Sequence, residues 1–292
     1  MQRYGKKLTM AIPVSVVSDI PHLREKTLEI GLIGRAAAIF RVNEIIIFTD
    51  NAGAPNQKQD RAMIATLLTY METPQYLRKQ LFKLIPELRY AGILPPLRTP
   101  HHPLESRAKR LRVGEHREGV VVAFNDMGSL VDIGVENPVL IEDKKLAVNK
   151  RVTVKVTKTG KPLKVMLIDA RDIEDYWGYT ITPSRGSFGK LVKSGKYDLV
   201  IATSKKGTPI QQIIDSLSRR YKKANNILVA FGAPSWGLQE IVSKENLSLE
   251  NIADFTINMI PDQGTETVRT EEAIYSSLAL LNAIDKEEKR NL

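Results

Sequence analysis

Three short apolar segments in the C-terminal half each run directly into a loop rich in glycine, proline or lysine. They occupy residues 198–209, 227–237 and 255–265, and each begins with a run of about five mostly apolar residues. Continuous apolar runs of this length are typical of parallel strands that are buried on both faces. In open α/β sheets, ligands bind beyond the carboxyl ends of such strands. Ordinary strand-to-helix connections have the same composition and are the favoured interpretation of any one loop. Three adjacent loops of this composition could surround a small molecule with backbone groups, since glycine lets the main chain approach closely.

Composition narrows the class of protein. Among 292 residues, 43 Lys and Arg oppose 33 Asp and Glu, so the formal net charge is +10. This excess favours a polyanionic partner, with nucleic acid ahead of an acidic membrane surface. Without cysteine the chain has no disulfide, thiolate nucleophile or Cys-ligated zinc, and we expect no metal.

No apolar run approaches the roughly 18 residues that a membrane-spanning helix needs. The apolar residues 8–17 are interrupted by Pro13 and predict a buried strand, not a secretory signal. We therefore predict a cytoplasmic protein with no membrane partner.

The rest of the N-terminal and C-terminal regions fits an α/β domain. Helices and strands alternate here: we expect a helix that begins at Pro21, a strand at 44–48 and a last helix that Thr270 caps. Two further helices are expected at residues 59–71 and 75–83. The proline-rich residues 92–103 are a domain boundary.

In the middle of the chain, the pattern of apolar residues changes to one typical of short strands. Short strands are predicted at 119–124, 129–134, 151–156 and 163–167, which suits a small closed sheet of the OB type. We predict an inserted domain at 103–170 within a domain formed by 1–102 and 171–292.

Residues 144–164 contain eight basic side chains and no acidic one. A solvated face is the ordinary interpretation of such a run. Here strand alternation favours a phosphate-facing patch. The predicted RNA-binding residues are Arg98, Lys144, Lys145, Lys150, Arg151, Lys155 and Lys158.

Two other motifs do not support a site. Residues 186–190 fail as a phosphate-binding loop, because the glycines are too close and Leu191 replaces the magnesium-binding hydroxyl. The adjacent His101 and His102 do not converge as a metal-binding pair does, so a structural or RNA-facing role is favoured.

The last loop carries a family resemblance. Residues 258–274 (NMIPDQGTETVRTEEAI) resemble the C-terminal motif of SPOUT-class RNA methyltransferases. Residues 232–238 (GAPSWGL) resemble the middle motif of this class, and 32–42 (LIGRAAAIFRV) resemble its N-terminal Gly-Arg motif. Within the class, the chain looks most like the subfamily with a small inserted β-domain. The likeness covers roughly 8–102 and 171–285.

The resemblance implies an α/β fold whose mostly parallel sheet ends in a C-terminal trefoil knot, with an OB-like barrel inserted. It implies S-adenosyl-L-methionine as cofactor and a homodimer that pairs through the knot. Arg35 would approach the acceptor, in the site of the partner subunit, and Arg269 is a second catalytic candidate. The implied cofactor-binding residues are Thr203, Ser204, Gly232, Pro234, Gly237, Leu238, Ile257, Ile260, Gln263, Gly264, Thr265, Thr270 and Ala273.

Two departures from the family pattern favour a base nitrogen over a ribose oxygen as acceptor. Ala233 and Pro234 stand where the ribose-methylating branch has a Glu, and residues 267–270 replace its Ser-Leu-Asn. The acceptor would lie in rRNA or tRNA, and uracil N3 is one option. The alternative is an RNA-binding or ribosome-assembly factor that kept the fold and lost catalysis. A small-molecule α/β enzyme would leave the basic run unexplained.

Overall fold

The computed structural model describes residues 6–51 and 56–285, and these form two compact units. One unit consists of Tyr70–Ile85 and Leu97–Gly178, and the other takes the rest of the described chain. The first unit therefore extends past residues 103–170 on both sides. In the described part of the chain, no helix is long and apolar enough to cross a membrane.

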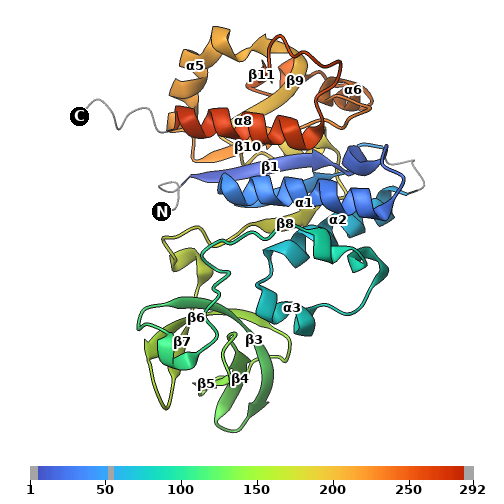
Figure 1. The fold of residues 1–292 in the computed structure, drawn as a ribbon. Helices are drawn as coiled ribbons and strands as arrows, with labels where there is room; N and C mark the ends of the chain where they lie inside the picture. Colours follow the sequence, from blue (N-terminus) through green and yellow to red (C-terminus); the bar gives the residue numbers. More distant parts are fainter. Residues whose placement is uncertain (1–5, 52–55, 286–292) are drawn as a thin grey trace. The chain divides into compact units, whose positions relative to one another are not determined.

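A six-stranded sheet forms the centre of the second unit, and all its strand pairs are parallel (Figure 1). Its order is β11-β9-β10-β1-β2-β8, which confirms the predicted parallel sheet. The sequence analysis missed β8, a short and mostly exposed edge strand. The strands are β1 (Lys7–Pro13), β2 (Glu44–Phe48), β8 (Thr180–Pro183), β9 (Leu199–Pro209), β10 (Asn226–Ala230) and β11 (Phe255–Asn258).

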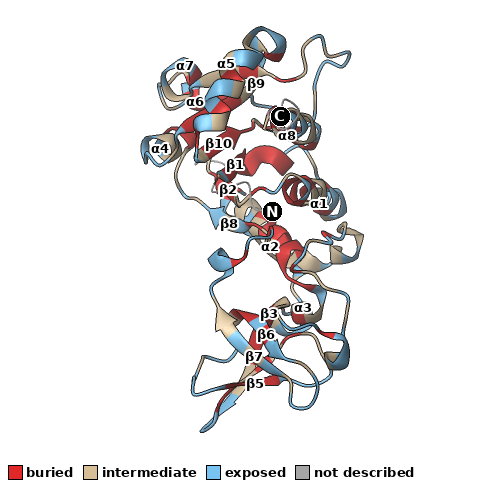
Figure 2. Cartoon of the chain, turned by 90° about the vertical axis from the view of Figure 1, so that its left-hand side faces the viewer, coloured by how far each residue is buried: buried red, intermediate tan, exposed pale blue. Residues whose placement is uncertain are grey.

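Helices cover both faces of this sheet. Figure 2 shows α1 and α8 on one side and α4, α6 and α7 on the other. The helices of the second unit are α1 (Leu23–Ile39), α2 (Gln57–Glu72, which ends in the first unit), α4 (Phe188–Lys193), α5 (Ile210–Lys223), α6 (Leu238–Ser243), α7 (Leu249–Ile252) and α8 (Thr270–Ile284). Helix α3 (Gln75–Leu81) belongs to the first unit. Short 3-10 turns lie at η1 (Val14–Val17), η2 (Pro86–Leu88), η3 (Ala91–Ile93), η4 (Ala108–Arg110) and η5 (Ala170–Asp172).

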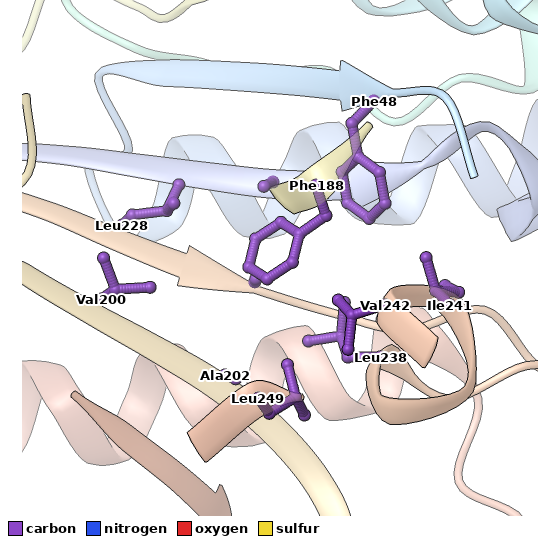
Figure 3. Close-up of a cluster of buried hydrophobic side chains, with 11 residues drawn as sticks. Phe48, Phe188, Val200, Ala202, Leu228, Leu238, Ile241, Val242 and Leu249 are labelled. Atoms are coloured by element: carbon purple, nitrogen blue, oxygen red, sulfur yellow. The ribbon is translucent and has the colours of Figure 1, made fainter. Parts of the chain in front are cut away.

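The core between the sheet and helices α4, α6 and α7 is apolar throughout (Figure 3). Phe48 from β2 and Phe188 from α4 meet with ring centroids 5.4 Å apart. Leu238, Ile241 and Val242 of α6 complete this layer. Buried aromatic and aliphatic side chains on both sheet faces explain why the strands read as unbroken apolar runs.

The first unit contains an antiparallel sheet with the order β5-β4-β3-β6-β7. Valine and isoleucine from these strands form its separate apolar core. The sequence analysis missed β5, which has four residues and follows Pro138. The strands are β3 (His116–Asn125), β4 (Gly128–Asp132), β5 (Val139–Glu142), β6 (Arg151–Lys158) and β7 (Lys164–Ile168).

A buried charge network joins the antiparallel sheet to the end of α2. Arg151 of β6 donates to both Glu72 carboxylate oxygens, at 2.5 and 3.0 Å, and to Glu118 at 2.6 Å. His101 lies 3.2 Å from the Glu72 carboxylate and is fully buried. Although burial opposes ionisation of Glu72, hydrogen bonds from His101 and Arg151 hold its pKa at about 2. Glu72 is therefore a buried carboxylate that depends on its partners.

This network changes the interpretation of two sequence features. Arg151, which we assigned to phosphate binding, is committed to two carboxylates inside its own unit. The strand alternation on which the phosphate-facing patch depended is interrupted as well, because Thr153 of β6 is buried and donates to Glu118 at 2.7 Å. The two histidines have structural contacts: His101 and His102 lie 2.9 and 2.7 Å from the Glu72 carbonyl oxygen.

Candidate active site

A cavity of about 260 Å³ opens at the carboxyl ends of β9, β10 and β11. This is where the three strand-loop segments predicted a ligand site. Nine of the thirteen residues assigned to the cofactor line it, namely Thr203, Ser204, Gly232, Pro234, Gly237, Ile260, Gln263, Thr270 and Ala273.

The first wall is an excursion within strand β9. The ladder between β9 and β11 pairs Ala202 with Thr256 and resumes at Thr208 with Ile257, so residues 203–207 leave the sheet between these points. The Thr203 hydroxyl donates to the Ala230 carbonyl at 2.9 Å, which ties the excursion to β10. Gly207 is required at the return, because a Cβ there would lie 2.7–2.8 Å from the backbone of Thr256 and Ile257.

The second wall is the tight loop after β10. The Ala233 N–H donates to the Trp236 carbonyl at 2.9 Å. A Cβ on Gly232 would lie 3.0 Å from both Gly237 Cα and Leu238 N, so this loop folds closely on itself. Thr270 does not cap α8 as predicted. It is the first helical residue, and its hydroxyl donates to the Gly232 carbonyl at 3.1 Å.

The third wall is the loop between β11 and α8. The Asn258 side chain accepts from the Ile260 N–H and donates to the Lys205 carbonyl, both at 3.0 Å. The Gln263 amide donates to the carbonyls of Thr265 and Glu266, at 2.8 and 3.1 Å. Gln263 therefore shapes its own loop as well as lining the cavity.

Four of the assigned cofactor residues do not line the cavity. Leu238 and Ile257 are fully buried. Gly264 and Thr265 are exposed on the last loop. The motif spacing identified the loop but could not tell which side of it faces inward.

An ion pair at the cavity was missed by the sequence analysis. Lys206 from the excursion contacts Glu240 from α6, with Nζ and Oε1 3.0 Å apart. The hydrogen bond from Lys206 lowers the pKa of Glu240. The strand-end rule could have found Lys206, but only the fold brings Glu240 beside it. Other lining residues that the analysis missed are Lys205, Phe231, Ala233, Asn258, Met259, Glu266, Thr267, Val268 and Ser277.

The two arginines assigned to catalysis do not line this cavity. Arg35 is half-buried on α1 and donates to the Pro96 carbonyl at 2.7 Å. Arg269 precedes α8, where its backbone N–H donates to Glu272 at 2.9 Å. Burial and a hydrogen bond with Glu271 raise the pKa of Glu29 to about 9, and the charge of Arg269 opposes this rise.

The cations assigned to RNA binding all lie in the unit with the antiparallel sheet. Lys150, Lys155 and Lys158 are exposed, as are Arg98 and Lys144. Lys145 is exposed as well and contacts Asp126 at 3.1 Å. Among the described residues, no group of three or more His, Asp or Glu side chains could hold a metal ion.

The ends of three strands of a parallel sheet thus surround a cavity with backbone groups, which defines an α/β protein with a candidate small-molecule site. Residues 7–281 match the model of the family described as "Putative RNA methyltransferase". The chain belongs to this family of RNA methyltransferases.

Similar proteins span nearly the whole chain. It is 31% identical to a 28S rRNA (uridine-N(3))-methyltransferase of Drosophila melanogaster, over 94% of this chain and 61% of that protein. A mouse protein of the same description is 34% identical, over 94% of this chain and 75% of its own length. An uncharacterized protein of Halobacterium salinarum is 32% identical and is covered over 98% of its length.

Proposed function

We propose that this protein transfers a methyl group from S-adenosyl-L-methionine to a base nitrogen of rRNA, with N3 of uridine as the acceptor. The observation that carries the proposal is the cavity at the three strand ends, in a chain whose relatives include uridine-N3 methyltransferases. The departures at residues 233–234 and 267–270 from the ribose-methylating pattern point the same way.

The lining of the cavity supports a nucleoside as the donor. Phe231, Met259 and Val268 supply apolar surface for a flat ring, and the loops supply backbone donors and acceptors for its edge. The Ser277 hydroxyl in the same wall is buried and finds no hydrogen-bond partner among the described residues, so a ligand could satisfy it. When bound, S-adenosyl-L-methionine would supply a methyl group already activated by its sulfonium.

The protein then has three tasks: to hold the donor, to aim the acceptor nitrogen at the methyl carbon and to remove one proton. Positioning of this kind can lower a barrier by about 7–11 kcal/mol. Rigid main-chain loops are suited to it. The excursion of β9 and the loop after β10 are both fixed by hydrogen bonds to neighbouring strands or helices.

We also propose that the C-terminal part of the chain forms a trefoil knot and that two copies pair through it. Arg35 does not line its own cavity, so the proposal assigns it to the site of the partner subunit. The antiparallel sheet would be an OB-like barrel inserted at residues 103–170, because its outer strands β5 and β7 lie close together although the described ladders leave them unpaired. The cytoplasmic location remains a prediction.

Calorimetry and a transfer assay test the enzyme. We expect S-adenosyl-L-methionine to bind the folded protein and labelled methyl groups to appear in rRNA as 3-methyluridine, measured by mass spectrometry of the nucleosides. Absence of donor binding, or methylation of ribose alone, would contradict the proposal. The exposed cations of the antiparallel sheet favour one second candidate, an RNA-binding factor without catalysis. That candidate predicts RNA binding with no transfer.

RNA affinity should depend on the exposed lysines of the antiparallel sheet. Each lost phosphate contact reduces the log–log salt slope by about 0.7–0.9. Changing Lys150, Lys155 and Lys158 together to glutamine should therefore flatten the slope by about 2 to 3, measured by RNA titration at several salt concentrations. The matched control changes the exposed Lys190, Lys193 and Lys196 of the other unit. An equal effect in the control would refute a localised RNA surface.

A further inference from the structure

The ion pair between Lys206 and Glu240 lies where a large substrate can reach it. Both residues line the cavity, yet their side chains remain 79% and 40% exposed. They come from different elements: Lys206 belongs to the excursion of β9, and Glu240 lies in the first turn of α6. The pair is thus part of the cavity wall that also faces solvent.

The geometry of the pair is held by the surrounding backbone. Glu240 lies against the tight loop after β10, since its Oε2 is 2.6 Å from the place a Cβ on Gly237 would occupy. The excursion that carries Lys206 is fixed to β10 by Thr203 and to the last loop by Asn258 and Lys205. Glu266 also lines the cavity, but its contact with Lys205 is through the backbone: the Glu266 carbonyl accepts from the Lys205 ammonium at 2.8 Å.

This wall offers ammonium donors and a carboxylate acceptor to an incoming base. The Watson–Crick edge of uracil presents a donor, N3–H, between two carbonyl acceptors, so the carboxylate suits the nitrogen and an ammonium suits a carbonyl. Cytosine has an unprotonated N3, whose lone pair would meet the carboxylate unfavourably. Enzymes that act on a base read this edge by hydrogen bonds once the base leaves the stack.

We propose that Glu240 accepts the N3 proton of the target uracil while Lys206 donates a hydrogen bond to an adjacent carbonyl oxygen. The pair would select uracil and prepare it for methylation, so this inference rests on the proposed function. The N3–H bond breaks and its proton moves to the Glu240 carboxylate. The nitrogen electron pair forms the new bond to the methyl carbon, and the electron pair of the broken carbon–sulfur bond stays on sulfur.

The charges of the pair suit these roles. Lys206 lowers the pKa of Glu240, so the carboxylate is ionised and able to accept a proton at neutral pH. It is a weak base, but N3–H becomes more acidic as the bond to the methyl carbon forms. The Lys206 ammonium meanwhile stabilises negative charge on the uracil oxygen, as preorganised donors do in other active sites.

Rates and their pH dependence test the assignment. Glu240→Gln should lower kcat by roughly 10²- to 10⁴-fold, the usual contribution of a general base. Its affinity for S-adenosyl-L-methionine should stay within about twofold of the wild type, because the loops that form the cavity are intact. The matched control is Glu250→Gln, an exposed residue of α7 that does not line the cavity. It should behave as wild type.

The pH dependence of kcat is a second test, because it would not change if Glu240 and Lys206 had only a structural role. The active form has Glu240 ionised, so kcat falls as the pH drops through the pKa of this group. Lys206→Gln removes the group that lowers this pKa, and the acidic limb should therefore move to higher pH. In Glu240→Gln the limb should disappear. An unmoved limb in both variants would overturn the assignment.

Base recognition can be measured without methyl transfer. In protein loaded with S-adenosylhomocysteine, uridine 5′-monophosphate should bind in preference to cytidine 5′-monophosphate, as measured by saturation-transfer NMR. Glu240→Gln should abolish this preference. If wild-type protein methylates uridine while Glu240→Gln keeps both its rate within threefold and its preference, the inference fails and the proposed function stands. If Glu240→Gln loses the preference but the wild type transfers no methyl group, the proposed function fails and base recognition by the pair stands.

Discussion

Glu72→Ala should lower the free energy of unfolding by about 3 kcal/mol, the low end for breaking a buried ion pair. The substitution leaves Arg151 with Glu118 alone and removes the carboxylate beside the buried His101. Chemical denaturation monitored by circular dichroism measures the change. The matched control is Glu142→Ala, which breaks the exposed contact with Lys164 and should cost less than about 0.5 kcal/mol.

The same residue fixes a pH dependence. Its pKa is about 2 in the folded protein against an ordinary value of 4.5. The folded state therefore gains stability from ionised Glu72 above pH 4.5 and loses it as the pH falls toward 2. Wild-type stability should decrease over this range more steeply than that of Glu72→Ala. Parallel curves would show that the network contributes nothing to acid sensitivity.

Gly232→Val should weaken binding of S-adenosyl-L-methionine by at least about 100-fold, which is roughly 2.7 kcal/mol. Its Cβ would press on the backbone of Gly237 and Leu238 at 3.0 Å, so the tight loop must shift and deform the cavity. Calorimetry gives the affinity, and circular dichroism checks that the variant is folded.

Gly264→Ala is the matched control for this variant. Gly264 belongs to the C-terminal motif of the family, but it lies outside the cavity lining and a Cβ there meets nothing within 4 Å. Its affinity for the donor should stay within about twofold of the wild type. Equal losses in both variants would mean that the loop after β10 has no special part in holding the cofactor.

The buried strands could be read from the sequence because each carries its own apolar signal. Residues 44–48 were predicted with the bounds that β2 has in the structure. β8 was missed because it is a short and mostly exposed edge strand, which needs no apolar run. β5 was missed because its apolar run, Val139 to Ile141, has only three residues.

The contact partners of charged side chains could not be predicted from such local patterns. Arg151 looked like one of eight similar cations, but its partner Glu72 is 79 residues away in the sequence. Lys206 and Glu240 are 34 residues apart and meet only because the excursion of β9 and the start of α6 lie at the same edge of the sheet. Loop positions follow from strand order, whereas the side of a loop that faces inward depends on backbone hydrogen bonds that leave no local pattern.

The return of β9 to its ladder has a consequence for how the cavity admits ligands. Residues 203–207 are anchored at both ends by pairing with the same strand, β11. A segment held in this way cannot swing as a flap, since moving it would break the sheet on either side. Exchange of small molecules must then depend on the other two walls and on rotation of the exposed lysine side chains. Most of the entropic cost of ordering this wall is met when the chain folds, before any ligand arrives.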